Sequence, residues 1–196
     1  MLLKRGNGSV AEAEYQNLRD RLRGGTRHCH AALDDEVTRL DRQGAEGYAR
    51  FLLLQWRLFA ALEPVSQGAA CAPVIRDLKQ RAGADLERLG RLAPVPRLPL
   101  EPHPLAVDYV VCGSRLGTKV LRKRWLDRGL PETAYAGSYL SAPPYMDYWR
   151  GYVARAEDLP AEGAAADRIV TDATCLFEFC LECISAESAE GKAIHA

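Results

Sequence analysis

Two histidines, His28 and His30, lie in the segment 22–33 at a spacing that a helix would turn through about 200°. Their side chains would therefore point in opposite directions. His30 precedes Leu33 by three residues and Val37 by seven, so it shares the apolar face of the expected helix, and we expect its imidazole to be buried. His28 falls on the polar side and is expected to face water. A neutral imidazole on an apolar helix face is a potential ligand for a metal ion.

Two arginines continue the helix face that carries His30. Arg27 precedes His30 by three residues and Arg23 by seven, so one face would present an imidazole with two cations upstream of it. This arrangement suits a flat, apolar ligand with iron at its centre and carboxylates at its edge, because imidazole binds iron and guanidinium groups pair with carboxylates. The alternative is a core histidine with satisfied hydrogen bonds beside ordinary surface arginines, and this segment alone leaves both open.

A second group of residues with unusual spacing lies in the run Gly113-Ser114-Arg115-Leu116-Gly117. It stands inside a segment that otherwise favours a helix, where each glycine costs about 1 kcal/mol relative to alanine. The two glycines share one helix face, which could approach another group closely or bend. A planar ligand lying against that face would use both glycines, with Ser114 placed to join a polar water network. The alternative is close packing of two helices through small residues.

Other residue types that can do chemistry form weaker patterns. Cys180 and Cys183 make a Cys-x-x-Cys pair, but zinc needs two more ligands and no second pair has suitable spacing, so we expect helix packing there. The basic run Arg122-Lys123-Arg124 is expected to be either a solvated helix face or a docking point for an acidic electron-transfer partner.

The elements that position these residues are all predicted to be helices. Apolar side chains recur at helical spacing, and no alternating pattern with hairpin turns predicts a strand. Gly24 and Gly25 are expected to end the first helix and Thr26 to cap the second. Five prolines between residues 93 and 104 predict an extended connector, and residues 129–143 are expected to form a loop. The predicted helices cover residues of about 11–23, 26–43, 46–63, 72–91, 105–128, 145–157 and 161–186.

The chain has 196 residues and a mass of 21.6 kDa, which predicts one domain over residues 1–196 with flexible tails at about 1–10 and 187–196. Apolar residues make up 47% and charged residues 27%, a balance typical of a globular protein. Equal numbers of basic and acidic residues, 26 of each, argue against nucleic-acid binding. The sequence contains neither an apolar run of roughly 20 residues nor the apolar core of a signal peptide. We therefore expect no nucleic acid or membrane partner, a cytoplasmic location, and six reduced cysteines.

The two helical motifs are more specific together than either is alone. The spacing Thr26-x-x-x-His30, followed about 80 residues later by Gly113-Ser-x-Leu-Gly-x-x-Val-Leu, resembles the haem oxygenase family, in particular its bacterial, biliverdin-producing members that occur near bacteriophytochromes. The resemblance covers residues of about 18–184 and is weak between 65 and 104. It implies an all-α, single-domain fold in which haem lies between a proximal helix and a kinked distal helix.

The resemblance also implies roles for particular residues. His30 matches the proximal ligand of the haem iron. Gly113 and Gly117 match the glycines of the distal helix, which lies over the haem face where oxygen binds. Ser114 stands where mammalian members have an aspartate that anchors a water network, so the proton path is left unassigned. Asp108 stands where mammalian members have a tyrosine that binds a propionate.

Further residues are implied to bind the edge of the haem. Arg23 and Arg27 match basic positions that pair with the propionates, and Arg150 matches another such position through a loose alignment. Thr26 opens the proximal motif and is grouped with the haem-binding residues. Phe177 matches an aromatic side chain near the haem edge on the last helix.

The reaction implied is the cleavage of haem to biliverdin, CO and ferrous iron, with haem as both substrate and cofactor. It consumes O₂ and electrons from an external donor such as a ferredoxin or a reductase, and a bacteriophytochrome would be a partner that accepts biliverdin. Three alternatives stay open. The protein could store or carry haem without cleaving it, be another enzyme of the same fold such as a thiaminase-type hydrolase or a di-iron oxidase, or be a helical interaction module.

Overall fold

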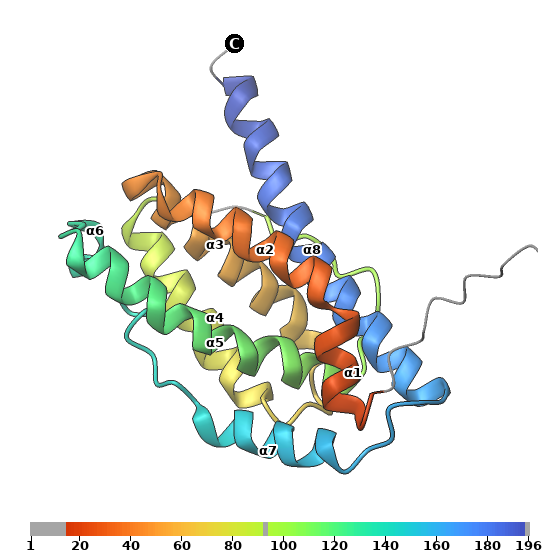
Figure 1. Cartoon of the computed structure of the whole chain (residues 1–196). Coiled ribbons are helices and arrows are strands. Elements are labelled where there is room, and N and C mark those ends of the chain that lie inside the picture. Colours follow the sequence, from red (N-terminus) through yellow and green to blue (C-terminus); the bar gives the residue numbers. More distant parts are fainter. Residues whose placement is uncertain (1–14, 92–93, 195–196) are drawn as a thin grey trace, which may run out of the picture.

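The computed structural model of the chain describes residues 15–91 and 94–194, and over these ranges it is helical and contains no strand (Figure 1). The predicted all-α class is therefore confirmed. Within these ranges the helices are α1 (Leu18–Gly25), α2 (Arg27–Asp41), α3 (Gly44–Leu62), the short 3-10 helix η1 (Glu63–Val65), α4 (Ala72–Arg88), α5 (Pro104–Asp127), α6 (Glu132–Tyr135), α7 (Met146–Glu157) and α8 (Ala164–Ile194).

The first helix differs most from its prediction. It begins at Leu18, because the Asn17 side chain accepts a hydrogen bond from the Asp20 backbone N–H at 3.0 Å and so caps the helix. Residues 11–14 of the predicted helix lie outside the described residues, as do the predicted tail at 1–10 and residues 195–196.

Gly24 and Gly25 lie inside α1 and do not end it, which corrects the sequence prediction. A Cβ added to Gly24 would come within 2.5 Å of the Tyr15 ring, and a Cβ added to Gly25 within 2.7 Å of the Val170 side chain on α8. The two glycines therefore allow close packing, which compensates for their low helix propensity.

The other helices lie close to their predicted ranges. α4 ends at Arg88, two residues before Gly90, which adopts a left-handed conformation with φ 65°. α6 forms a short helix within the segment 129–143, which was expected to be a loop. α8 continues to Ile194, beyond its predicted end and through most of the predicted C-terminal tail.

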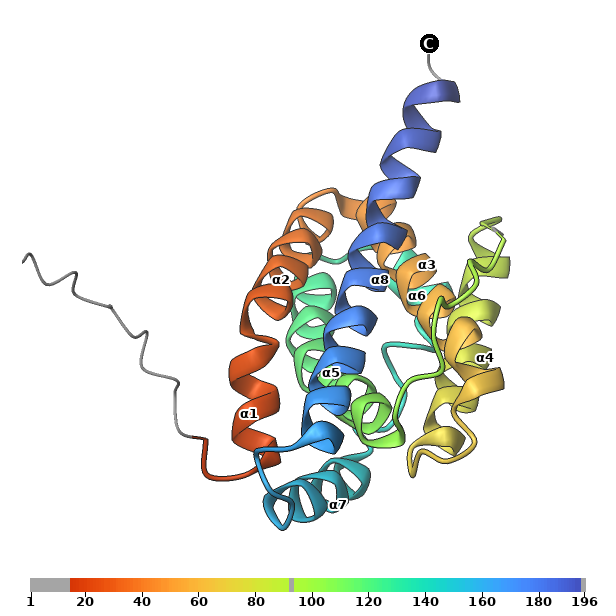
Figure 2. The same ribbon diagram turned by 90° about the vertical axis from the view of Figure 1, so that its right-hand side faces the viewer.

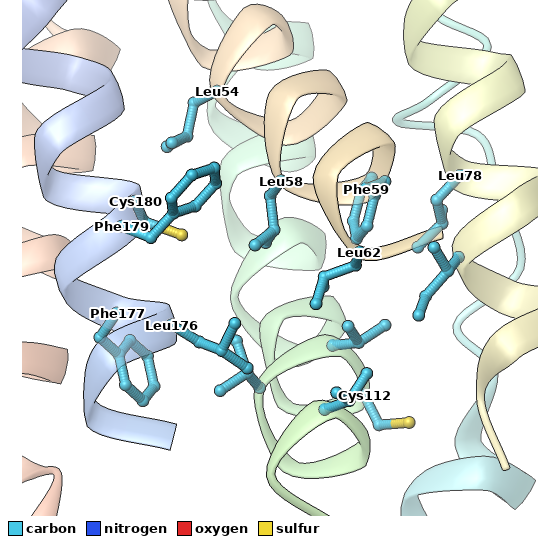
Figure 3. Packing of buried hydrophobic residues seen from close by; sticks show 14 of the residues in the cluster. Leu54, Leu58, Phe59, Leu62, Leu78, Cys112, Leu176, Phe177, Phe179 and Cys180 are labelled. Atoms are coloured by element: carbon cyan, nitrogen blue, oxygen red, sulfur yellow. The ribbon is translucent and has the colours of Figure 1, made fainter. Parts of the chain in front are cut away.

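Helix α3 lies at the centre of the packing. It contacts α4 on one side and α2 and α8 on the others. In Figure 3, Leu58 and Leu62 of α3 lie between Leu78 of α4 and Leu176 of α8, and all four side chains are buried. Each fully buried leucine contributes about 1.5–3 kcal/mol of transfer free energy, so this layer holds the helices around α3 in place.

Helices α2 and α5 both pack on α8. Figure 2 shows α1 and α2 along one side of the molecule and α3 and α4 along the other, with α5 and α8 between them. α2 packs on α3 and α8, whereas α5 packs on α7 and α8. Among residues 15–91 and 94–194, no helix combines the length and the apolar character needed to cross a lipid bilayer.

Candidate functional site

A cavity of about 480 Å³ opens between α2 and α5, and residues of α1, α3, α7 and α8 complete its walls. Its volume lies within the range of about 300–1,000 Å³ that is usual for small-molecule sites. Leucine, valine, phenylalanine and tryptophan side chains supply much of the lining. The polar side chains in the wall are Arg19, Arg23, His30, Asp34, Gln55, Tyr109, Ser114 and Thr118.

His30 lies in the α2 wall of the cavity, but its side chain is 52% exposed. The prediction that it would be buried was wrong, because the face of α2 that carries His30, Leu33 and Val37 points to the cavity and not into a neighbouring helix. The buried residues of α2 are Cys29, Leu40 and Asp41. His28 is exposed, as predicted.

Two neighbours hold the His30 ring. Its Nδ1 lies 3.0 Å from Asp34 Oδ2, one helical turn later, and the Phe177 ring meets it edge-on at a centroid distance of 5.3 Å. When Asp34 accepts the Nδ1–H, the other ring nitrogen, Nε2, keeps a free lone pair. Metal-binding histidines in proteins are usually held by a carboxylate in this way. Phe177 is buried and lines the cavity, so this predicted residue and His30 are brought together.

Gly113, Ser114 and Gly117 form part of the α5 wall, so the structure brings these predicted residues to the same cavity as His30. A Cβ added to Gly113 would lie 3.5 Å from the Trp149 ring, which is an ordinary contact, and a Cβ added to Gly117 would meet nothing within 4 Å. Close packing of two helices therefore does not explain Gly117. A ligand lying against α5 would explain a glycine that costs the helix about 1 kcal/mol.

The polar groups of the α5 wall are bonded within the helix. The Ser114 hydroxyl donates to the Val111 carbonyl at 2.8 Å, and the Thr118 hydroxyl donates to the Ser114 carbonyl at 3.0 Å. Among the described residues that line the cavity, Asp34 on α2 is the only one with a carboxylate. The α5 side of the cavity thus has hydroxyls but no acidic group.

The predicted cations divide into two groups. Arg23 lines the cavity, and so does Arg19, which sequence reasoning missed; Arg19 also pairs with Glu157 at 2.5 Å. Arg27 is exposed and does not line the cavity, although it lies between Arg23 and His30 in sequence. Arg150 forms an exposed ion pair with an acid of its own helix, away from the lining. The cavity therefore has two guanidinium groups, both from α1.

Thr26 acts on the cavity through Tyr109, to which it is hydrogen-bonded. Its hydroxyl donates to the Leu22 carbonyl at 2.7 Å, so it makes no capping bond to α2, contrary to the prediction. The same hydroxyl lies 3.0 Å from the hydroxyl of Tyr109, a residue of the cavity wall. Burial raises the pKa of Tyr109, which keeps it a neutral hydrogen-bonding group. Thr26 thus positions Tyr109 without lining the cavity.

Asp108 is turned away from the cavity. It is buried, and its carboxylate accepts hydrogen bonds from the Cys71 backbone N–H at 2.9 Å and from Arg155 at 2.7 Å. These bonds tie the start of α4 and the end of α7 to α5. The residue therefore has an architectural role in this chain.

Sequence reasoning also missed two residues of the cavity wall that a pattern could have found. Asp34 follows His30 by four residues, the spacing at which helix side chains meet. Gln55 is a polar residue in the otherwise apolar run 51–56. A polar residue within such a run indicates either a satisfied core group or a group that faces a ligand.

The cysteines do not gather into a metal site. All six are free thiols, and among the described residues no group of three or more His, Cys, Asp or Glu could hold a metal ion. Cys180 lines the cavity and Cys183 is buried nearby on α8. In the basic run, Lys123 pairs with Asp127, and Arg124 lies 3.6 Å from Asp41.

The cavity fits a flat, largely apolar ligand with a metal ion at its centre and carboxylates at one edge. His30 supplies a free imidazole nitrogen from α2, the glycines leave room along α5, and the arginines of α1 supply positive charge. No protein-family model matches the chain, and no curated protein matches it. Function is therefore inferred from the residues of the cavity.

Proposed function

We propose that this protein is a haem oxygenase, which cleaves haem to biliverdin, CO and ferrous iron with O₂ and electrons from an external donor. The observation that carries the proposal is the placement of His30 and of Gly113 and Gly117 in the walls of one cavity of about 480 Å³. The fold is then of the haem oxygenase type, with α2 as the proximal helix and α5 as the distal helix.

On the proximal side, three residues act together. His30 Nε2 binds the iron, Asp34 holds the imidazole by its Nδ1–H, and Phe177 limits rotation of the ring. The Asp34 carboxylate also makes the imidazole a stronger electron donor, as such partners generally do. When bound, haem supplies the iron that activates O₂ and the porphyrin ring that is cleaved.

On the distal side, the shape of α5 decides what fits. Gly117 leaves open space at its Cβ position, and Gly113 has room beside Trp149, so the backbone of α5 can lie close to the face of the ring. Ser114 keeps its hydroxyl on the Val111 carbonyl, and no carboxylate comes from α5. The protons that the reaction consumes therefore arrive through water held in the cavity.

At the edge of the ring, positive charge orients the substrate. Arg23 and Arg19 pair with the propionates, since guanidinium groups bind carboxylates in a defined geometry. Arg27 and Arg150 lie outside the lining, so we assign the propionates to Arg23 and Arg19. Tyr109, held by Thr26, presents its hydroxyl to the same cavity.

The partners follow from the reaction. Electrons come from a ferredoxin or a reductase, and Arg122 on α5 belongs to the basic run at which an acidic donor would dock. Biliverdin leaves the cavity, and a bacteriophytochrome is the proposed acceptor. The proposed location is the cytoplasm.

Turnover in air tests the proposal and separates it from haem storage on the same fold. We load the purified protein with haemin and add ascorbate, or a ferredoxin with its reductase. An oxygenase shows a Soret band that decays while the broad red absorption of biliverdin grows, with release of CO. A Soret band that persists with every donor indicates a storage protein, and an absence of any saturable haem spectrum contradicts haem as the ligand.

A further inference from the structure

A buried cation lies behind the α5 wall of the cavity. Arg115 is 4% exposed, and only its Nη2 donates a hydrogen bond, to the Ala142 carbonyl at 3.3 Å. Its Nε and Nη1 have no hydrogen-bond partner, and no carboxylate among the described residues forms an ion pair with it. Burying a charge in this way is costly, so a compensating role for the charge is expected.

The guanidinium group of Arg115 lies against Tyr139. Its Cζ is 5.0 Å from the centre of the Tyr139 ring, a cation–π distance. Burial raises the pKa of Tyr139, while the positive charge of Arg115 opposes that rise. The net effect keeps the Tyr139 hydroxyl protonated and therefore able to donate.

The Tyr139 hydroxyl donates to Gln55 Oε1 at 2.7 Å. This bond occupies the carbonyl end of the amide and so fixes which way the amide points. Gln55 lines the cavity, and no described residue accepts a hydrogen bond from its Nε2. The Tyr139 ring also packs on Arg115 of α5, so Gln55 meets the cavity on the α5 side. The contacts thus form a series from the buried cation of Arg115 through Tyr139 to Gln55. The series ends at the two free N–H groups of the Gln55 amide.

We propose that the Gln55 amide donates a hydrogen bond to a small ligand bound to the haem iron on the α5 side, and that Tyr139 and Arg115 are positioning residues for that amide. This inference rests on the proposed function, because it requires haem in the cavity. The inference adds to the proposed function a hydrogen-bond donor on the α5 side of the cavity, where α5 itself has no acidic group. The hydrogen bond from Tyr139 to Gln55 Oε1 strengthens the amide as a donor, because polarisation adds along a chain of hydrogen bonds in a low-dielectric interior.

The test replaces the amide without changing the shape of the wall. Gln55→Met keeps the length of the side chain and removes both N–H groups. Leu58→Met is the matched control, because Leu58 lies on the same helix, lines the same cavity and has no polar atom to lose. Both variants and the wild type are loaded with haemin, and the Soret titration is recorded first.

The readouts do not depend on turnover. In the ferrous protein under CO, Gln55→Met should raise the C–O stretching frequency relative to the wild type, because a hydrogen bond to the ligand lowers it. In the ferric protein, azide should bind about tenfold more weakly, the value of one lost hydrogen bond. Leu58→Met should leave both quantities unchanged, and Tyr139→Phe should give a smaller shift in the same direction.

The outcomes separate this inference from the proposed function. If all variants bind haem and Gln55→Met has the wild-type C–O frequency and azide affinity, Gln55 is not the donor, although haem binding stands. If Leu58→Met shifts the frequency as far as Gln55→Met does, the effect comes from shape and the inference is overturned. If the wild type does not bind haem, both the proposed function and this inference fail.

Discussion

Polar groups packed away from the cavity and polar groups in its wall differ in how they are bonded. Away from the cavity, the buried carboxylates of Asp108 and Asp85 accept hydrogen bonds on both oxygens. Asp108 accepts from Cys71 and Arg155, and Asp85 on α4 accepts from the backbone N–H groups of Ser138 and Tyr139 at 3.0 and 2.7 Å. Each carboxylate ties segments that are distant in sequence, and each lies below the surface. These acids hold the architecture together.

In the cavity wall, some polar groups have no hydrogen-bond partner among the described residues. They include Nε2 of His30 and the amide nitrogen of Gln55. Gly117 leaves open space where another residue would have a Cβ. Polar groups without a protein partner in the wall of one cavity are available to bind a ligand there.

The largest expected effect is on stability and lies on the bonded side. Asp108→Ala removes a buried carboxylate that Arg155 and the Cys71 N–H share, and we expect a loss of about 3–5 kcal/mol in the free energy of unfolding. Urea denaturation measures this loss. Asp167→Ala removes an exposed acid, paired with Arg21, and should cost about 1 kcal/mol or less. A similar cost for both variants would contradict the contrast drawn between the two sides.

The next effect is on ligand binding and lies on the cavity side. Asp34→Ala frees His30 Nδ1, and we expect haem to bind about 10–100-fold more weakly, as for other residues that support a metal ligand. Its denaturation midpoint without haem should stay close to the wild type, because the side chain is exposed. Asp35→Ala, the adjacent exposed acid, should leave haem affinity unchanged. Equal haem affinities for the two variants would show that Asp34 does not support the haem ligand.

The smallest effect separates two kinds of helical glycine. Gly117→Ala should raise the free energy of unfolding by about 1 kcal/mol, because alanine favours the helix and its methyl group meets open space. The same change should slow haem turnover, since the methyl group would enter the cavity. Gly25→Ala should instead destabilise the protein by about 1–3 kcal/mol, because its methyl group would strike Val170. Destabilisation by Gly117→Ala would mean that α5 packs closely at that position.

Sequence patterns predict the helices well and the cavity only in part. The apolar period places α3, α5 and α7 within a few residues of their observed bounds, because periodicity reports the buried face of a helix. It does not report whether that face meets a helix or a cavity, and for this reason His30 was expected to be buried. The sequence predicted that α1 would end at Gly24 and Gly25. The prediction was wrong because these glycines make room for Tyr15 and Val170, and no local pattern reveals those contacts.

The polar series behind α5 could not be predicted for a similar reason. Gln55, Arg115 and Tyr139 come from α3, α5 and the segment before α7, and only the tertiary fold brings them together. Arg150 was assigned without such a tertiary contact. A loose sequence match assigned it to a ligand, whereas it forms an exposed ion pair on α7.

The central claim is that His30 binds the iron of a haem held between α2 and α5. An optical titration with haemin tests it most directly, with wild type, His30→Ala and His28→Ala compared under the same conditions. We expect a saturable Soret band for wild type and His28→Ala, and a lost or shifted band for His30→Ala that added imidazole restores. A wild-type spectrum for His30→Ala without imidazole would contradict the claim, as would the absence of a saturable band in the wild type.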